Sequence, residues 1–121
     1  MKKLRIAIPT KAHAGLEDVV SEVFGKAKTF TVVDVENGEA VNVQVVDNPA
    51  TSYDYGSGPI ASKTLADLKV DFVVTAELGP GASSLLEQHN IKRLLAKPGM
   101  KVAESIREAL TELGANEAKQ T

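Results

Sequence analysis

Two glycine-containing turns have the composition of an anion-binding site. Residues 56–59 (Gly-Ser-Gly-Pro) and 79–81 (Gly-Pro-Gly) each lie where a helix is expected to begin. Glycine lets a ligand approach the backbone closely, and a helix N-terminus offers free N–H groups and the positive end of the helix dipole. We therefore predict an anionic ligand at these turns. The same residues also serve simple tight turns, and neither segment matches a Walker A loop or a dinucleotide-binding fingerprint.

Few side chains near the turns could act as acid–base groups or metal ligands. His13, beside Lys11 in a loop, is the candidate metal ligand, although a lone surface histidine commonly has no such role. Glu77 follows an expected strand, where a solvated carboxylate is the simpler interpretation. The sequence contains no Ser-His-Asp set, His–Glu metal pair or nucleophile elbow. It thus predicts a protein that binds without catalysis.

Composition narrows the function classes further. The 121 residues include no cysteine, which excludes thiolate zinc sites, thiol nucleophiles and thiolate-held iron–sulfur clusters. The chain has 14 Lys+Arg against 16 Asp+Glu, and this balance argues against binding of nucleic acid by phosphate neutralisation. No apolar run approaches the ~20 residues that span a bilayer. We therefore expect a cytoplasmic protein with neither nucleic-acid nor membrane partners.

Short apolar runs alternate with amphipathic segments, which predicts an α/β domain. Valine- and threonine-rich strands at 29–35 and 40–47 flank an Asn-Gly pair, which is a strong hairpin signal. Helical spacing of apolar residues predicts a helix after each glycine turn and a last helix at 101–113. Further strands, of the buried type, are expected at 4–8, 71–75 and 91–96.

These elements are expected to form one domain over residues 1–114, followed by a frayed polar tail at 115–121. Parallel crossovers in the second half place strands 1, 4 and 5 side by side, with the hairpin extending one edge. The predicted mixed five-stranded sheet has the order 3-2-1-4-5, with strand 2 antiparallel. Ligands favour the crevice beyond the carboxyl ends of such strands. We expect that crevice between the loops 9–15 and 76–81, with the loop 48–58 near the same edge.

Four short segments, in their order and spacing, resemble one protein family. They are residues 6–9 (Ile-Ala-Ile-Pro), 20–27 (Val-Ser-Glu-Val-Phe-Gly-Lys-Ala), 58–59 (Gly-Pro) and 78–82 (Leu-Gly-Pro-Gly-Ala). Together they resemble the dinitrogenase iron–molybdenum cofactor biosynthesis family, which includes NifX, NifY and the C-terminal part of NifB. The resemblance covers residues 2–113 and implies a ribonuclease H-like fold with three α/β/α layers.

The resemblance implies a small stand-alone accessory protein that carries an iron–sulfur or iron–molybdenum cluster and is not an enzyme. Such a cluster is anionic, so the glycine turns with Lys11 or Lys26 could hold it without thiolates. The implied partners are the metal cluster or a small anionic ligand, and a cofactor-assembly protein. The expected ligand-binding residues are Lys11, His13, Phe24, Gly25, Gly56, Ser57, Gly58, Glu77, Gly79 and Gly81.

The chain departs from the family pattern at two positions. Val23 stands before the Phe-Gly pair, and Tyr55 stands ahead of the Gly-x-Gly-Pro turn, where members commonly carry histidine. His13 is then the histidine left near the expected crevice. The alternative is a metal-free module on the same fold, which binds a small anion or interacts with another protein.

Overall fold

Strands and helices alternate along the chain in the order that the sequence predicts. The computed structural model describes the backbone of residues 3–120 and the side chains of residues 3–114. The strands are β1 (Lys3–Thr10), β2 (Thr29–Glu36), β3 (Glu39–Asp47), β4 (Phe72–Thr75) and β5 (Lys92–Leu95). The helices are α1 (Ser57–Asp67), α2 (Pro80–Gln88) and α3 (Val102–Gln120), with short 3-10 helices at Gly15–Glu17 and Pro49–Ser52.

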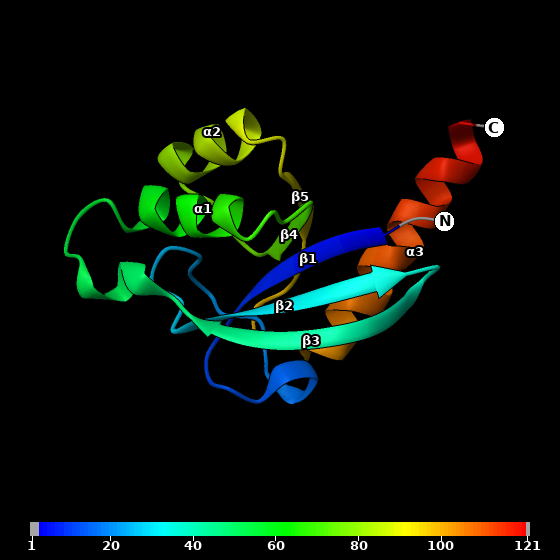
Figure 1. The fold of residues 1–121 in the computed structure, drawn as a ribbon, viewed down its shortest axis with the longest axis horizontal. Helices are drawn as coiled ribbons and strands as arrows, with labels where there is room; N and C mark the ends of the chain where they lie inside the picture. The colour runs from blue at the N-terminus through cyan, green and yellow to red at the C-terminus, as the bar shows by residue number, and fades with distance from the viewer. Residues whose placement is uncertain (1–2, 121) are drawn as a thin grey trace.

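The five strands form one mixed sheet with the order β3-β2-β1-β4-β5. β2 runs antiparallel to β1 and β3, whereas β1, β4 and β5 run parallel to one another. The predicted strand order and directions are therefore confirmed (Figure 1). The hairpin turns at Asn37 and Gly38, whose φ angles of 54° and 82° lie in the left-handed region that a two-residue hairpin favours.

β1 continues to Thr10, past the expected end at Ile8, because a proline is tolerated at residue 9. The parallel pairing of β1 with β4 ends at Ala7 opposite Val73, so no residue of β4 pairs with Pro9. Pairing with β2 continues to Thr10 opposite Thr29. β1 therefore reaches the edge of the sheet where the functional loops begin.

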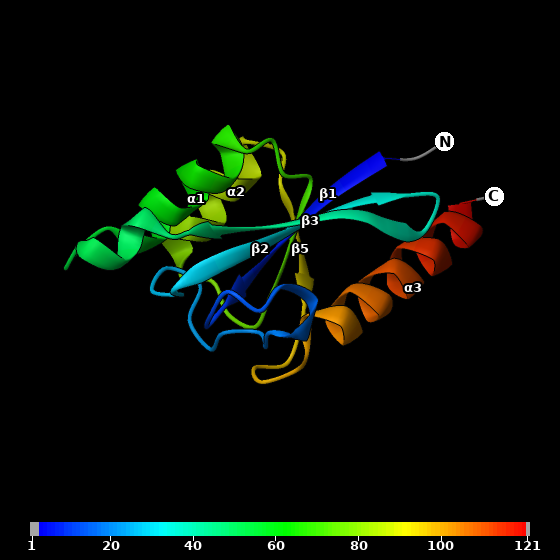
Figure 2. The same ribbon diagram turned by 60° about the horizontal axis from the view of Figure 1, so that its bottom comes forward.

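Side chains alternate across the sheet and supply a separate core on each face. On one face the sheet packs against α1 and α2 through a core that includes Ala7, Phe30 and Leu65. On the other face it packs against α3 through a core that includes Ile6 and Ile106. Figure 2 shows α1 and α2 on one side of the strands and α3 on the other, which gives the three layers.

Helix α3 is longer than the sequence pattern suggests. The expected end near Leu113 is wrong, because α3 continues through Gly114 to Gln120. Glycine costs about 1 kcal/mol inside a helix, but residues 115–120 (Ala-Asn-Glu-Ala-Lys-Gln) include several strong helix formers. The side chains of this segment and Thr121 lie outside the described residues, and the domain boundary at 114 stays a prediction. No helix in the described part of the chain combines the length and hydropathy needed to cross a membrane.

The connection between β1 and β2 folds back and packs against the start of α1. Asn48 holds this connection in place, because its side-chain amide donates hydrogen bonds to the carbonyl oxygens of Gly25 and Ala27 at 3.1 and 2.8 Å. Gly25 then lies directly on the first turn of α1. A Cβ atom at this glycine would lie 2.9 Å from both the backbone nitrogen of Gly58 and Oγ of Ser57. The absence of a side chain at Gly25 therefore sets how closely the connection approaches α1.

An ion pair joins β1 and β2 at the opposite end of the sheet. Arg5 Nε donates to Asp34 Oδ1 at 2.7 Å, and Arg5 Nη1 donates to the carbonyl oxygen of Leu68 at 2.8 Å. The hydrogen bond from Arg5 is the main reason why the pKa of Asp34 lies below its ordinary value. Burial opposes this lowering of the pKa, and the side-chain amide of Asn42 adds to it.

The first prediction concerns the close contact at Gly25. We expect Gly25→Ala to lower the free energy of unfolding by about 1–3 kcal/mol, because the new methyl group meets backbone atoms that cannot move aside. Gly114→Ala is the matched control, since nothing lies within 4 Å of the added Cβ and α3 is helical there. This control should raise the free energy of unfolding by about 0.5–1 kcal/mol. Urea denaturation measures both, and equal effects of the two substitutions would contradict the account.

The second prediction concerns Asp34 and pH. The pKa of Asp34 is lower in the folded protein than in the unfolded chain, so ionised Asp34 stabilises the folded state. This contribution to the free energy of unfolding is fully present above the unfolded pKa and is lost as the pH falls through the folded pKa. We expect Asp34→Asn to lower the free energy of unfolding by about 1 kcal/mol at pH 7. That difference should shrink between about pH 5 and about pH 2. Urea denaturation across this range tests it, and a pH-independent difference would contradict the assignment.

Candidate functional site

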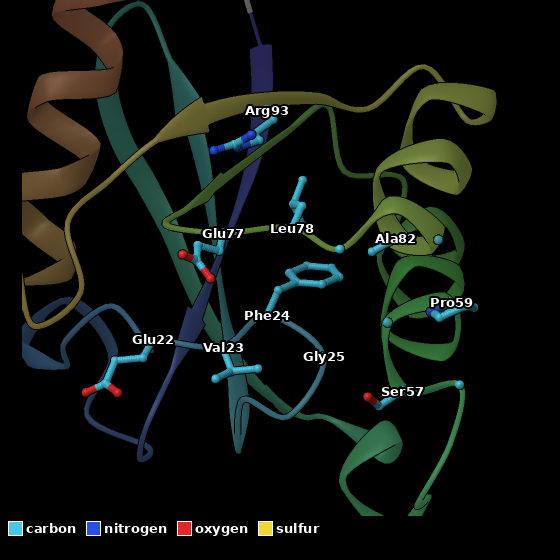
Figure 3. A pocket seen from close by; sticks show the side chains of 14 residues that line it. Glu22, Val23, Phe24, Gly25, Ser57, Pro59, Glu77, Leu78, Ala82 and Arg93 are labelled. Atoms are coloured by element: carbon cyan, nitrogen blue, oxygen red, sulfur yellow. The ribbon is translucent and has the colours of Figure 1, made fainter.

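A crevice of about 680 Å³ opens at the edge of the sheet where the parallel strands end. Its walls come from residues 22–25 of the β1–β2 connection, residues 56–59 at the start of α1, and residues 77–82 of the β4–α2 loop and first turn of α2. Arg93 on β5 completes the lining (Figure 3). The crevice lies at the edge predicted from the strand order. Its first wall is 22–25, however, and not the expected loop 9–15.

The start of α1 presents backbone donors to this crevice. Its N-cap residue is Gly56, at φ 73°, and no side chain caps the helix. The first N–H to bond back to the N-cap is that of Ile60, which donates to the carbonyl oxygen of Gly56 at 3.1 Å. Among the described residues, the N–H groups of Ser57 and Gly58 have no hydrogen-bond partner. Both N–H groups therefore keep unused hydrogen-bonding capacity at the start of the helix.

The start of α2 has the same form. Its N-cap residue is Gly79, which again provides no capping side chain. The N–H of Ser83 donates to the carbonyl oxygen of Gly79 at 3.0 Å, and Pro80 has no N–H. The N–H groups of Gly81 and Ala82 have no partner in the described part of the chain. Two uncapped helix N-termini, each with the positive end of its dipole, thus border one crevice.

Small residues allow these two helix starts to meet. A Cβ atom at Gly58 would lie 3.3 Å from Cβ of Ala82, which is closer than most such contacts. A Cβ atom at Gly81 would lie 3.6 Å from Cγ of Pro59, an ordinary contact distance. The close approach therefore depends on Gly58 in α1 and on the small Ala82 in α2.

Apolar side chains form the middle of the crevice. Phe24 is 3% exposed and packs against Phe30 of β2, with ring centroids 5.4 Å apart. Val23 is 53% exposed beside it, although it is apolar. Figure 3 shows the ring of Phe24 and the side chain of Leu78 between Arg93 and the first turns of α1 and α2. A ligand in the crevice would therefore contact apolar surface as well as N–H donors.

The charged groups of the crevice are Glu22, Glu77 and Arg93. Glu22 is partly neutralised by Lys11, whose Nζ lies 3.6 Å from its carboxylate oxygen. Arg93 Nη2 donates to the carbonyl oxygen of Ala76 at 3.2 Å. Figure 3 shows both carboxylates on the side of the crevice away from Ser57 and Ala82, so the acidic groups and the helix N-termini occupy different sides.

The structure brings most of the predicted ligand-binding residues together. Those that line the crevice are Phe24, Gly25, Gly56, Ser57, Gly58, Glu77, Gly79 and Gly81. Lys11 reaches this region only through its ion pair with Glu22. His13 does not line the crevice, because its Nε2 lies 2.7 Å from Asp47 Oδ1 at the end of β3. Lys26 donates instead to the backbone oxygen of Tyr53.

Six residues that line the crevice are not among those that the sequence predicts: Glu22, Val23, Pro59, Leu78, Ala82 and Arg93. All but Arg93 lie within the segments that resemble the family, 20–27, 58–59 and 78–82, so membership of these segments could have identified them. Arg93 had a different signal, since it precedes Leu94 in a short strand whose residues alternate between the two faces. Because Leu94 packs in the core beneath α3, Arg93 must face the side of α1 and α2.

The described side chains do not form a metal site of their own. No group of three or more His, Cys, Asp or Glu residues in this part of the chain is arranged to hold a metal ion. Within the crevice, Glu22 and Glu77 are the side chains with metal-binding atoms, and neither imidazole nor thiolate is present. The arrangement can instead bind an anion through N–H groups against an apolar surface.

Comparison with known proteins supports the resemblance found in the sequence. The apo form of the orange protein from Desulfovibrio gigas is 30% identical, with a TM-score of 0.80 over 89% of this chain and 88% of that chain. A Thermotoga protein described as a NifB protein is also 30% identical, with a TM-score of 0.71 over 90% of this chain and 88% of that chain.

A further relative comes from sequence comparison alone. An uncharacterised protein of Methanocaldococcus jannaschii is 29% identical over 91 residues, which cover 75% of this chain and 73% of that protein. The family model described as dinitrogenase iron-molybdenum cofactor matches residues 2–112, and these residues include every segment that lines the crevice. The chain therefore belongs to the dinitrogenase iron–molybdenum cofactor family.

Proposed function

We propose that this protein is a non-catalytic carrier that binds an anionic metal–sulfur cluster in the crevice between α1 and α2. The observation that carries the proposal is the meeting of two uncapped helix N-termini at one crevice, in a chain of this family. The cluster is cargo and not a permanent cofactor. Its source and destination would be proteins that assemble the cofactor.

Backbone N–H groups suit such a cargo because of its charge. The N–H groups of Ser57, Gly58, Gly81 and Ala82 can donate to sulfide or thiolate sulfur of an anionic cluster. Neither glycine turn presents a carboxylate beside these donors, and the acidic groups Glu22 and Glu77 lie across the crevice (Figure 3). The donors also need no reorganisation, since the two helices already hold them.

The missing thiolates and imidazoles restrict the kind of cluster that fits. Without cysteine or histidine in the lining, the protein offers few atoms to replace ligands on the metal. The cargo must therefore bring a complete set of its own ligands and bind by hydrogen bonds and apolar contact. Phe24 and Leu78 provide surface against which weakly hydrated sulfur atoms can pack. Weak attachment of this kind suits a protein that must release what it carries.

The second candidate is a metal-free module that binds a small anion at the same helix N-termini. The specific observation in its favour is the lack of imidazole and thiolate groups among the lining residues. The two candidate functions make different use of the apolar middle of the crevice. A metal–sulfur cluster gains binding free energy from contact with Phe24 and Leu78, whereas a small hydrated anion such as phosphate gains none. Competition between phosphate and a cluster therefore separates them.

The third prediction tests the role of the N-terminus of α2. We expect Gly79→Asp to weaken cluster binding at least about tenfold, because the new carboxylate accepts hydrogen bonds from the N–H groups of Gly81 and Ala82 and repels the anion. The same change should leave the folded state as stable as before, since aspartate is a good N-cap residue. The measurement is anaerobic gel filtration with an anionic [4Fe–4S] cluster ligated by mercaptoethanol, followed by iron analysis of the protein peak.

Gln44→Glu is the matched control, because it adds one negative charge on exposed β3 away from the crevice. It should retain iron as the unmodified protein does. If the unmodified protein retains no iron, the carrier proposal fails for this chain. If both substitutions weaken binding equally, the cluster is held by overall charge and not at α2. Release of the bound cluster by millimolar phosphate would favour the small-anion module.

A further inference from the structure

Arg93 is the one cationic side chain among the residues that line the crevice in the described structure. It lies on β5, an edge strand, opposite Val73 of β4. Its neighbour Leu94 is buried beneath α3, so alternation turns Arg93 toward the face that carries α1 and α2. Figure 3 shows it above Leu78, on the other side of Phe24 from Ser57.

The guanidinium group is held in place without being neutralised. Nη2 donates to the carbonyl oxygen of Ala76, at the start of the loop that leads into α2. No carboxylate of the described residues forms an ion pair with Arg93, although Glu22 and Glu77 line the same crevice. Arg5 shows the contrast, because it is paired with Asp34 at 2.7 Å.

Arg93 is exposed, so water solvates the free donors of its guanidinium group in the empty crevice, and an anion from outside the chain can replace that water. The guanidinium group has five N–H donors, and the bond to Ala76 uses one of them. The planar fork that remains matches the oxygen atoms of a carboxylate, whereas single sulfide atoms offer no paired acceptors. The side chain is therefore suited to an oxygen-based anion and not to the metal–sulfur core.

We propose that Arg93 determines the specificity of the crevice by binding a carboxylate group carried on the outside of the cargo. The helix N-termini hold the anionic core, and Arg93 holds this second group on the other side of Phe24 and Leu78. The preferred cargo is then a cluster that bears a carboxylate ligand. This inference rests on the proposed carrier function and adds the chemical class of the cargo.

The fourth prediction compares two [4Fe–4S] clusters of similar size, one ligated by mercaptoethanol and one by mercaptoacetate. We expect Arg93→Gln to weaken binding of the mercaptoacetate cluster about tenfold, because it loses a charge-assisted pair of hydrogen bonds. Binding of the mercaptoethanol cluster should change less than twofold. For the mercaptoacetate cluster, the affinity of Arg93→Lys should lie between that of the unmodified protein and that of Arg93→Gln. Lysine keeps the positive charge but lacks the planar pair of donors. Anaerobic titration followed by absorbance gives all the dissociation constants.

Lys92→Gln is the control for charge, because it removes a cation from the same strand at an exposed position that does not line the crevice. It should weaken binding of either cluster by much less than Arg93→Gln weakens binding of the mercaptoacetate cluster. If Arg93→Gln weakens neither cluster, or weakens both by the same factor, the inference is wrong and the carrier function stands. If the unmodified protein binds neither cluster, both proposals fail. An unchanged melting temperature for Arg93→Gln shows that the fold is intact.

Discussion

The crevice exists because three segments of backbone approach one another where only very small residues fit. Gly25 from the β1–β2 connection lies against Gly58 at the start of α1, and Gly58 lies against Ala82 at the start of α2. Larger residues at the two glycines would push the segments apart. Asn48 reinforces the contact by binding two carbonyl oxygens of the connection. The spacing of the donors around the crevice follows from this contact.

The electrostatic character of the site follows from the same arrangement. Both helices that start at this edge lack capping side chains, so their first N–H groups stay available. At Gly79, whose φ of −71° suits any residue, a serine or aspartate would occupy the donors of α2, whereas the φ of 73° at Gly56 favours glycine. The chain leaves the donors of two neighbouring helices without a side-chain cap, which is the pattern expected when a ligand takes the place of the cap.

Much of the fold follows from local sequence signals, whereas the details of the site depend on contacts between distant segments. The Asn37-Gly38 turn and the alternation of strands and helices predict the sheet order, because few right-handed connections are compatible with them. The place of His13 after β1 predicts that it lies near the crevice, but the connection folds so that His13 meets Asp47 of β3 and residues 22–25 form the wall. The apolar pattern ends near Leu113, so it does not predict that α3 continues to Gln120. Arg93 can be predicted to line the crevice only when the face of β5 on which it lies is known.

The central claim is that backbone N–H groups at the starts of α1 and α2 hold the anionic cluster. An anaerobic ¹H–¹⁵N NMR titration with the mercaptoethanol-ligated [4Fe–4S] cluster tests it most directly, because each backbone amide gives its own signal. The account predicts that the amide signals of Ser57, Gly58, Gly81 and Ala82 shift and broaden first. If the first signals to change were instead those around His13 and the end of β3, the claim would be contradicted.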